Sequence, residues 1–189
     1  MHRMMMQASE YLVALRVIDK NDAAIFRYGL EMMLLTIAEV ASVLMIAAFV
    51  GNFVETFLYF LAFIPLRLFA GGYHATTRLR CYLLSLVVYG VFSLCLNVVS
   101  VRWFAEWSLG AALFSLIIIF VWAPVIHKNK SVSAQDLVSC KKISRFVAVI
   151  ETALIIIGCL YYQSIGVFAF ALGFLGEACS ILVTKCLLH

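Results

Sequence analysis

Charged residues are scarce in this chain: Asp, Glu, Lys and Arg make up 13% of its 189 residues, whereas 65% are hydrophobic. Soluble domains carry about 25% charged residues, so this composition excludes an ordinary soluble globular protein. Apolar runs of about 20 residues, each long enough to cross a bilayer as a helix, recur through nearly the whole sequence. The composition therefore predicts an integral membrane protein with little chain left for a soluble domain.

The chain also lacks the patterns that bind metals or form disulfides. Its six cysteines include no Cys-x-x-Cys pair, and its four histidines have no recognisable ligand spacing, so we expect neither a metal site nor a structural disulfide. Cys95, Cys159 and Cys179 lie among aliphatic residues, where a free cysteine behaves as a small apolar residue. No cofactor and no nucleic-acid partner are expected.

The N-terminal segment has no apolar core and no small-residue cleavage site, which argues against a secretory signal peptide. Residues 4–20 mix charged and apolar side chains in the manner of an amphipathic helix. Such a helix can lie in the inner membrane interface, where its cations meet anionic lipid, or pack on the helix bundle.

The fold class predicted is all-α, a polytopic membrane protein of about six transmembrane helices. The whole chain, 1–189, is expected to form one domain, with an interfacial segment at 1–30 and a bundle at 31–189. A four-span arrangement is the main competitor. The predicted spans are Met32–Val50, Phe53–Phe69, Cys81–Val101, Trp107–Ile126, Phe146–Tyr162 and Ile165–Thr184.

The basic residues are distributed asymmetrically among the predicted loops. Arg102 is the one basic residue in an odd-numbered loop, and the other 13 of the 14 lysines and arginines share the opposite face. The positive-inside rule makes that face cytoplasmic. We therefore expect a multi-pass protein of the cell membrane with both termini in the cytoplasm.

The segment from Arg67 to Cys81 carries the candidate chemistry. It places an imidazole (His74), a thiol (Cys81), two adjacent glycines and three arginines between two apolar segments. Such groups are costly at the edge of a bilayer, so a catalytic use is the first explanation to test. By the same charge rule, this segment is cytoplasmic.

The spacing of His74 and Cys81 excludes a continuous helix if the two residues act together. Seven residues of helix separate side chains by about 10.5 Å along the axis, whereas a general base must come within about 3 Å of its nucleophile. Gly71 and Gly72 permit a backbone that folds back, and Thr76 or Thr77 can cap a helix beginning just before Cys81. The helix dipole and nearby arginines would favour a thiolate there, while desolvation would oppose it.

Less specific explanations remain open for each of these residues. A loop histidine and an interfacial cysteine can occur by chance, and arginines at a helix end often only anchor it to lipid. His127 and Cys140 form an alternative base and nucleophile, but they lack the glycine turn. The cluster Lys128, Lys130, Lys141, Lys142 and Arg145 is either the positive-inside signal or a binding surface for an acidic peptide.

The motifs resemble a known family, the accessory gene regulator B (AgrB) proteins of quorum-sensing systems, over essentially the whole chain. The resemblance is carried by Arg-x4-Gly-x-His-x6-Cys, formed by Arg67, Gly72, His74 and Cys81, and by Ala123-Pro124 with a lysine-rich loop. Asn129 separates two of those lysines, whereas the family pattern has an unbroken run.

The resemblance implies a cysteine endopeptidase that removes the C-terminal tail of an AgrD-like propeptide, with Cys81 as nucleophile and His74 as base. Arg67, Gly71, Gly72 and Thr77 would stabilise the oxyanion or position the substrate, unless Arg67 only anchors the second span. The lysines Lys128, Lys130, Lys141 and Lys142 would attract the acidic tail. The implied partners are the propeptide, membrane lipid and a second copy in a homodimer.

Two functions of other classes compete with proteolysis. A transporter of small solutes or peptides would also be polytopic, although the sequence has no evident repeat halves or paired broken helices. A noncatalytic membrane scaffold would make the Gly, His and Cys arrangement accidental. Loss of the Cys81 thiol discriminates, because only proteolysis requires it.

Overall fold

The structure is a computed structural model that describes residues 11, 23–73, 77–125, 134–162 and 164–188. It contains six long helices within those residues, and all six are long and apolar enough to cross a membrane, which confirms the predicted all-α polytopic fold and favours six spans over four. The predicted amphipathic helix at 4–20 falls almost entirely outside the described residues. The helices are α2 (Ala23–Val50), α3 (Phe53–Ala70), α4 (Arg78–Val98), α5 (Phe104–Trp122), α6 (Ala134–Tyr161) and α7 (Ile165–Leu188), with a 3-10 turn at Val101–Trp103.

The start of α6 differs from the prediction. We expected this span to begin at Phe146 and left Lys141, Lys142 and Arg145 in a loop, but the helix begins at Ala134 and contains all three. The stretch 134–145 has no glycine or proline and is rich in good helix formers. Charged residues interrupt an apolar run but do not end a helix, so hydropathy alone placed the start of α6 too late in the chain.

The chain divides into two compact units, Met1–Ile46 and Ala47–His189. Most of α2 belongs to the first unit, and its last residues belong to the second. The second unit contains α3 to α7 and, with them, every described residue of the candidate site.

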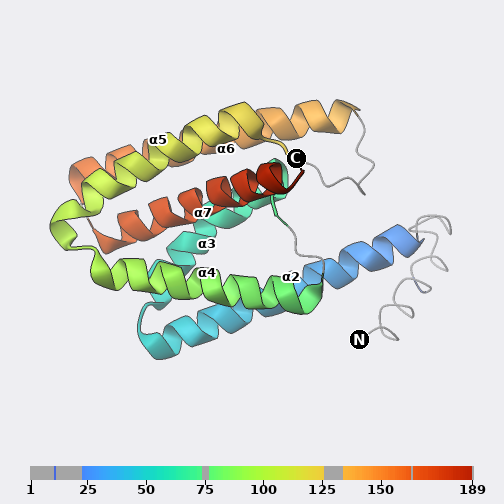
Figure 1. Ribbon diagram of the computed structural model, residues 1–189, viewed down its shortest axis with the longest axis horizontal. Helices are drawn as coiled ribbons and strands as arrows, with labels where there is room; N and C mark the ends of the chain where they lie inside the picture. The colour runs from blue at the N-terminus through green and yellow to red at the C-terminus, as the bar shows by residue number, and fades with distance from the viewer. Residues whose placement is uncertain (1–10, 12–22, 74–76, 126–133, 163, 189) are drawn as a thin grey trace. The chain divides into compact units, whose positions relative to one another are not determined.

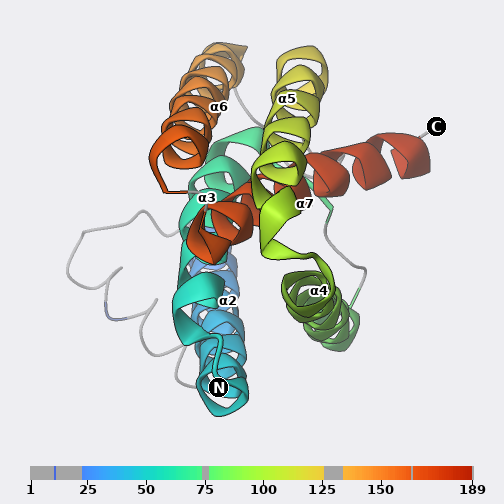
Figure 2. The same ribbon diagram turned by 90° about the vertical axis from the view of Figure 1, so that its left-hand side faces the viewer.

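Helix α7 is the centre of the second unit, because it contacts α3, α4, α5 and α6 (Figures 1 and 2). Small residues permit the close approach of α3 and α7: a Cβ added to Gly173 would lie 3.1 Å from the Cβ of Ala62. Ala171 and Ala178 of α7 are also fully buried. Small side chains at helix contacts are typical of membrane bundles, where van der Waals packing replaces the hydrophobic effect.

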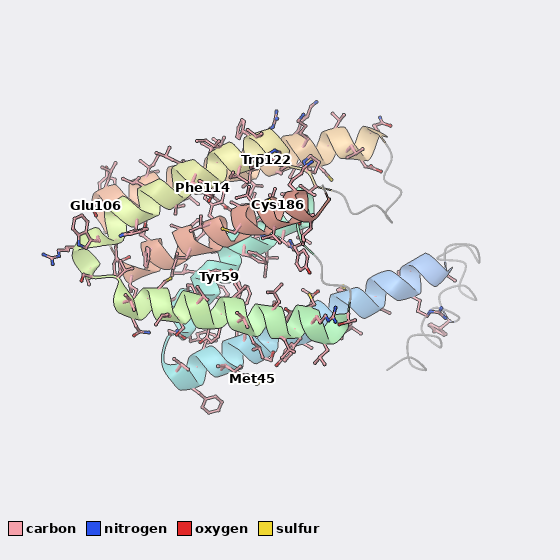
Figure 3. All side chains as sticks on the ribbon, viewed as in Figure 1. Met45, Tyr59, Glu106, Phe114, Trp122 and Cys186 are labelled. Carbon is pink, nitrogen blue, oxygen red and sulfur yellow. The ribbon has the colours of Figure 1, made fainter. Side chains whose placement is uncertain are left out.

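The candidate site lies at one end of this unit. The last residues of α3, α5 and α7 and the first residues of α4 and α6 lie on the same side of the unit (the right-hand side of Figure 1). Trp122 and Cys186 mark this end in Figure 3, and Glu106 marks the opposite end.

Polar contacts at the opposite end fix the second half of α4 to the start of α3. The Tyr89 hydroxyl donates to Asn52 Oδ1 over 2.9 Å, and Asn52 Nδ2 donates to Ser93 Oγ over 3.2 Å. Helix α4 is thus held at the end far from Cys81, which lies in its first turn.

Candidate active site

Cys81 lies at the start of α4, as the sequence predicted. Thr77 is the N-cap residue, and its side chain accepts a hydrogen bond from Arg80 N over 3.3 Å. The first backbone bond of the helix runs from Cys81 N to Thr77 O, over 3.1 Å. Cys81 is partly exposed, so its thiol is accessible in a way that a core cysteine is not.

Thr77, which lies between His74 and Cys81, has an extended backbone (φ −129°, ψ 150°), so the two residues do not share one continuous helix, as the sequence predicted. His74 itself lies outside the described residues, as do Thr76, Lys128 and Lys130. The close approach of His74 to Cys81 therefore stays a prediction. The contacts described below concern the backbone directly before His74.

Arg67, in the last turn of α3, binds this backbone. Its Nη1 donates to Gly71 O over 3.3 Å, and its Nη2 donates to Tyr73 O. The same Nη1 also donates to Ser180 Oγ of α7 over 2.6 Å. The five donors of a guanidinium suit this task, because their fixed fork reaches several acceptors at once.

Glu177, one turn before Ser180 on α7, supplies the opposite charge. Its side chain is fully buried, and its Oε2 lies 3.7 Å from Arg67 Nη1. An acid within a membrane span is costly unless it pairs with a basic residue or is protonated. The structure places Arg67 as the neighbour of Glu177, so the guanidinium is shared between a buried acid and the Gly71–Tyr73 backbone.

Both glycines of the motif are required by close contacts. Gly71 has φ +77° and forms a parallel β-bridge with Val125, whose N–H donates to Ala70 O over 2.8 Å. Gly72 has φ +137°, and an added Cβ would strike Arg67 Nη1 and lie 2.6 Å from Ser180 Oγ. A larger residue would have neither the conformation nor the space.

Sequence reasoning missed Ser180 and Val125, which complete this arrangement. Ser180 Oγ accepts from Tyr73 N over 2.9 Å in addition to its bond from Arg67. A serine in an apolar helix carries no pattern that distinguishes a tertiary contact from a bond to its own helix. The nearest local signal was Pro124, because a proline restricts the residue before it to an extended backbone, and Ala123 has φ −77° and ψ 144°.

The described basic residues near α6 differ in environment. Lys141 and Lys142 are exposed. Arg145 instead donates from Nη2 to Phe120 O over 2.7 Å and lies over the Phe120 ring. Since Phe120 is in the last turn of α5, Arg145 satisfies a carbonyl at that helix end and joins α5 to α6.

All six cysteines have free thiols. Cys159 is buried, as expected for a packing residue, whereas Cys179 is exposed on the surface of α7. Within the described residues, no group of three or more His, Cys, Asp or Glu side chains could hold a metal ion.

A family comparison decides what kind of protein carries this arrangement. The model of the family Accessory gene regulator B matches residues 5–184, nearly the whole chain. The chain belongs to the AgrB family. Membership links it to quorum-sensing peptide processing, and with the six apolar helices it identifies a multi-pass membrane protein.

Individual relatives agree with this membership. A protein of Clostridium perfringens, provisionally named AgrB-like protein 1, is 26% identical over 143 residues, which are 76% of this chain and 75% of the relative. Provisionally named AgrB-like proteins of Listeria monocytogenes serotype 4a and Listeria innocua are 34% and 33% identical over 99 residues. Those matches cover 52% of this chain and 47%, about half, of each Listeria protein. No solved structure matches the chain.

Proposed function

We propose that this AgrB-family protein is a membrane cysteine endopeptidase that removes the C-terminal tail of an AgrD-like propeptide. Cys81 is the nucleophile and His74 is the general base and acid. The observation that carries the proposal is the rigid start of the motif: Arg67 and Ser180 bind the backbone of Gly71–Tyr73, directly before His74. These partly buried polar contacts hold the backbone that leads into the candidate base.

The chemistry follows from the two groups. The Cys81 sulfur attacks the scissile carbonyl carbon, His74 transfers the thiol proton to the departing amine, and a thioester joins the propeptide core to Cys81. An internal Cys or Ser of the propeptide then attacks the thioester carbonyl. This releases the Cys81 thiol and closes a thiolactone or lactone ring, and the poorly hydrated interface disfavours competing hydrolysis.

The position of Cys81 supports this assignment. It is partly exposed in the first turn of α4, and Thr77 caps the start of that helix. Arg67 donates to the Tyr73 and Gly71 carbonyls and lies beside Glu177. These contacts favour a positioning role for Arg67 over direct stabilisation of an oxyanion.

The proposed substrate meets the enzyme through charge and membrane partition. An amphipathic propeptide helix would gather on the cytoplasmic leaflet, and its acidic tail would be attracted to the exposed Lys141 and Lys142 and to Lys128 and Lys130. The active form would be a homodimer with both termini and the active site on the cytoplasmic side.

Mass spectrometry of an AgrD-like propeptide with the purified protein in lipid tests the proposal. Wild type should cleave the tail and carry a tail-less adduct, and Cys81→Ala should do neither. His74→Ala should lose cleavage while keeping the thiol. Cys140→Ala is the matched control, because it removes a thiol from the same end of the bundle and should leave cleavage intact.

The alternative function, transport of a small solute or peptide, predicts a different result. Uptake or export by Cys81→Ala at the wild-type rate, with no cleavage by any variant across several propeptides, would replace the peptidase proposal by the transporter. Cleavage that survives in Cys81→Ala and fails in Cys140→Ala would move the nucleophile to Cys140.

A further inference from the structure

Ser180 links α7 to the backbone of Tyr73, and this hydrogen bond spans 107 positions of sequence. Its hydroxyl oxygen accepts from Tyr73 N over 2.9 Å and from Arg67 Nη1 over 2.6 Å. A hydroxyl oxygen has two acceptor lone pairs, so these two bonds use its full capacity as an acceptor. Such a double contact is specific to the oxygen at this position.

The bonds hold a particular peptide plane. The Tyr73 carbonyl accepts from Arg67 Nη2, and that carbonyl belongs to the peptide bond that joins Tyr73 to His74. The preceding peptide plane is held through Tyr73 N–H by Ser180. Because peptide units are planar, the two bonds restrain the peptide planes on either side of the Tyr73 Cα, directly before His74 in the chain.

The surroundings leave little room for this backbone to shift. Gly72 is buried, and a Cβ there would lie 2.6 Å from Ser180 Oγ. Glu177, on the same face of α7, lies with Oε2 3.7 Å from Arg67 Nη1 and has a fully buried side chain. Helix α7 thus contacts the motif through an acceptor for its backbone and an acid beside its arginine.

We propose that Ser180 is a positioning residue of the peptidase reaction, assisted by Glu177: α7 fixes the peptide planes before His74 through Ser180 and Arg67. The proposal rests on the proposed function, because it assigns Ser180 to the Cys81 and His74 pair. A general base must come within about 3 Å of its nucleophile, and a displacement of about 1 Å can cost roughly a hundredfold in rate.

Ser180→Ala tests the role, with Ser115→Ala as the matched control. Ser115 is a fully buried serine of α5 whose hydroxyl donates to Ala111 O of its own helix over 2.7 Å. Both variants delete one hydroxyl from a helix interior, but only Ser180→Ala removes an acceptor of the motif backbone. Both are purified as full chains in lipid.

Hydrogen exchange and Cys81 alkylation are then measured. Ser180→Ala should speed exchange of the Tyr73 amide by roughly tenfold, because the amide loses its acceptor, and Ser115→Ala should not. The pH profile of Cys81 alkylation by iodoacetamide should shift toward that of His74→Ala. The kcat for propeptide cleavage should fall by about ten- to a hundredfold with little change in KM.

Each outcome decides the proposal. An unchanged Tyr73 amide in Ser180→Ala would overturn the contact, and faster exchange with wild-type alkylation and kcat would overturn its catalytic relevance. If Ser115→Ala has the same effects as Ser180→Ala, Ser180 contributes only to general packing and has no positioning role. If alkylation of wild type does not depend on His74, the dyad fails and the positioning role fails with it; faster Tyr73 exchange would still show that Ser180 holds the backbone.

Discussion

The side chains of Arg67 in α3 and Ser180 in α7 hold the Gly71–Tyr73 backbone, and Gly72 is the residue with the least freedom to change. Gly72→Ala should destabilise the protein by about 1–3 kcal/mol, because φ +137° is unfavourable for alanine and the new Cβ would strike Arg67 and Ser180. Propeptide cleavage should be lost. Thermal unfolding in detergent and the cleavage assay measure the two effects.

Gly90→Ala is the control for this substitution. Gly90 lies within α4, and a Cβ there would meet nothing within 4 Å. Its stability should be unchanged or raised, since alanine favours helices more than glycine by about 0.5–1 kcal/mol. Equal stability losses in both variants would refute the steric argument for Gly72.

Glu177 and Arg67 are expected to be energetically coupled. Glu177→Leu should destabilise the fold by about 1–3 kcal/mol, because it leaves a largely buried guanidinium beside an apolar side chain. The double variant Arg67→Met/Glu177→Leu should cost less than the two single variants together, and unfolding in detergent measures the difference.

Glu151→Leu serves as the comparison for Glu177→Leu. Glu151 is a buried acid of α6 whose Oε2, like both carboxylate oxygens of Glu177, has no hydrogen-bond partner within the described residues. Because Glu177 in addition lies 3.7 Å from Arg67 Nη1, replacing Glu151 by leucine should cost less than replacing Glu177. Additive losses for Arg67→Met and Glu177→Leu would show that their ion pair contributes nothing.

At the scale of elements, the start of α4 depends on its cap. Thr77→Ala removes the acceptor for Arg80 N and should cost about 1 kcal/mol, loosening the first turn that carries Cys81. Thr77→Ser keeps the acceptor and should behave as wild type. The rate of propeptide cleavage, corrected for folded fraction, should fall several-fold in Thr77→Ala alone; an equal fall in both variants would deny the cap its role.

The extension of α6 presents exposed charge rather than a flexible loop. Lys141→Glu/Lys142→Glu should weaken processing of a propeptide with an acidic tail, with an effect that diminishes at high salt. Cys81 alkylation should be unaffected. The measurement is kcat/KM against ionic strength for acidic and neutralised tails.

Arg145→Gln is the control that distinguishes a loss of basic charge at the binding surface from a loss of stability. Arg145 bonds Phe120 O at the end of α5, so its loss should lower thermal stability without a specific dependence on tail charge. If Lys141→Glu/Lys142→Glu lowers the processing rate of acidic-tailed and neutral-tailed propeptides by the same factor, electrostatic capture by α6 is rejected.

At the scale of the whole molecule, six spans place alternate loops on opposite faces. In a cysteine-free background, Ser100→Cys and Ser164→Cys should react with a membrane-impermeant maleimide in intact cells. A single Cys140 should react only after the membrane is opened, because it lies on the basic face. Labelling of Cys140 from outside would reverse the predicted orientation.

Much of the fold could be predicted from the sequence, because hydropathy and helix capping depend on residues that are close together in the chain. Long apolar runs identified six spans, and Thr77 before Cys81 identified a helix start, since capping depends on neighbours in the chain. Local signals did not place the start of α6, because polar helix formers extend a helix beyond the apolar run. The catalytic roles of His74 and Cys81 both stay predictions.

The sequence by itself determined the membrane class, the helix count and the family motif, because hydropathy and short motifs are local properties. Only the tertiary structure decided what surrounds the motif: Ser180 on α7 and Val125 after α5 bond the residues around Gly71 and Gly72. Those partners are brought together by the packing of small residues between α3 and α7. A contact across more than 100 residues leaves no periodic trace in a single sequence, since each partner is unremarkable in its own helix or loop.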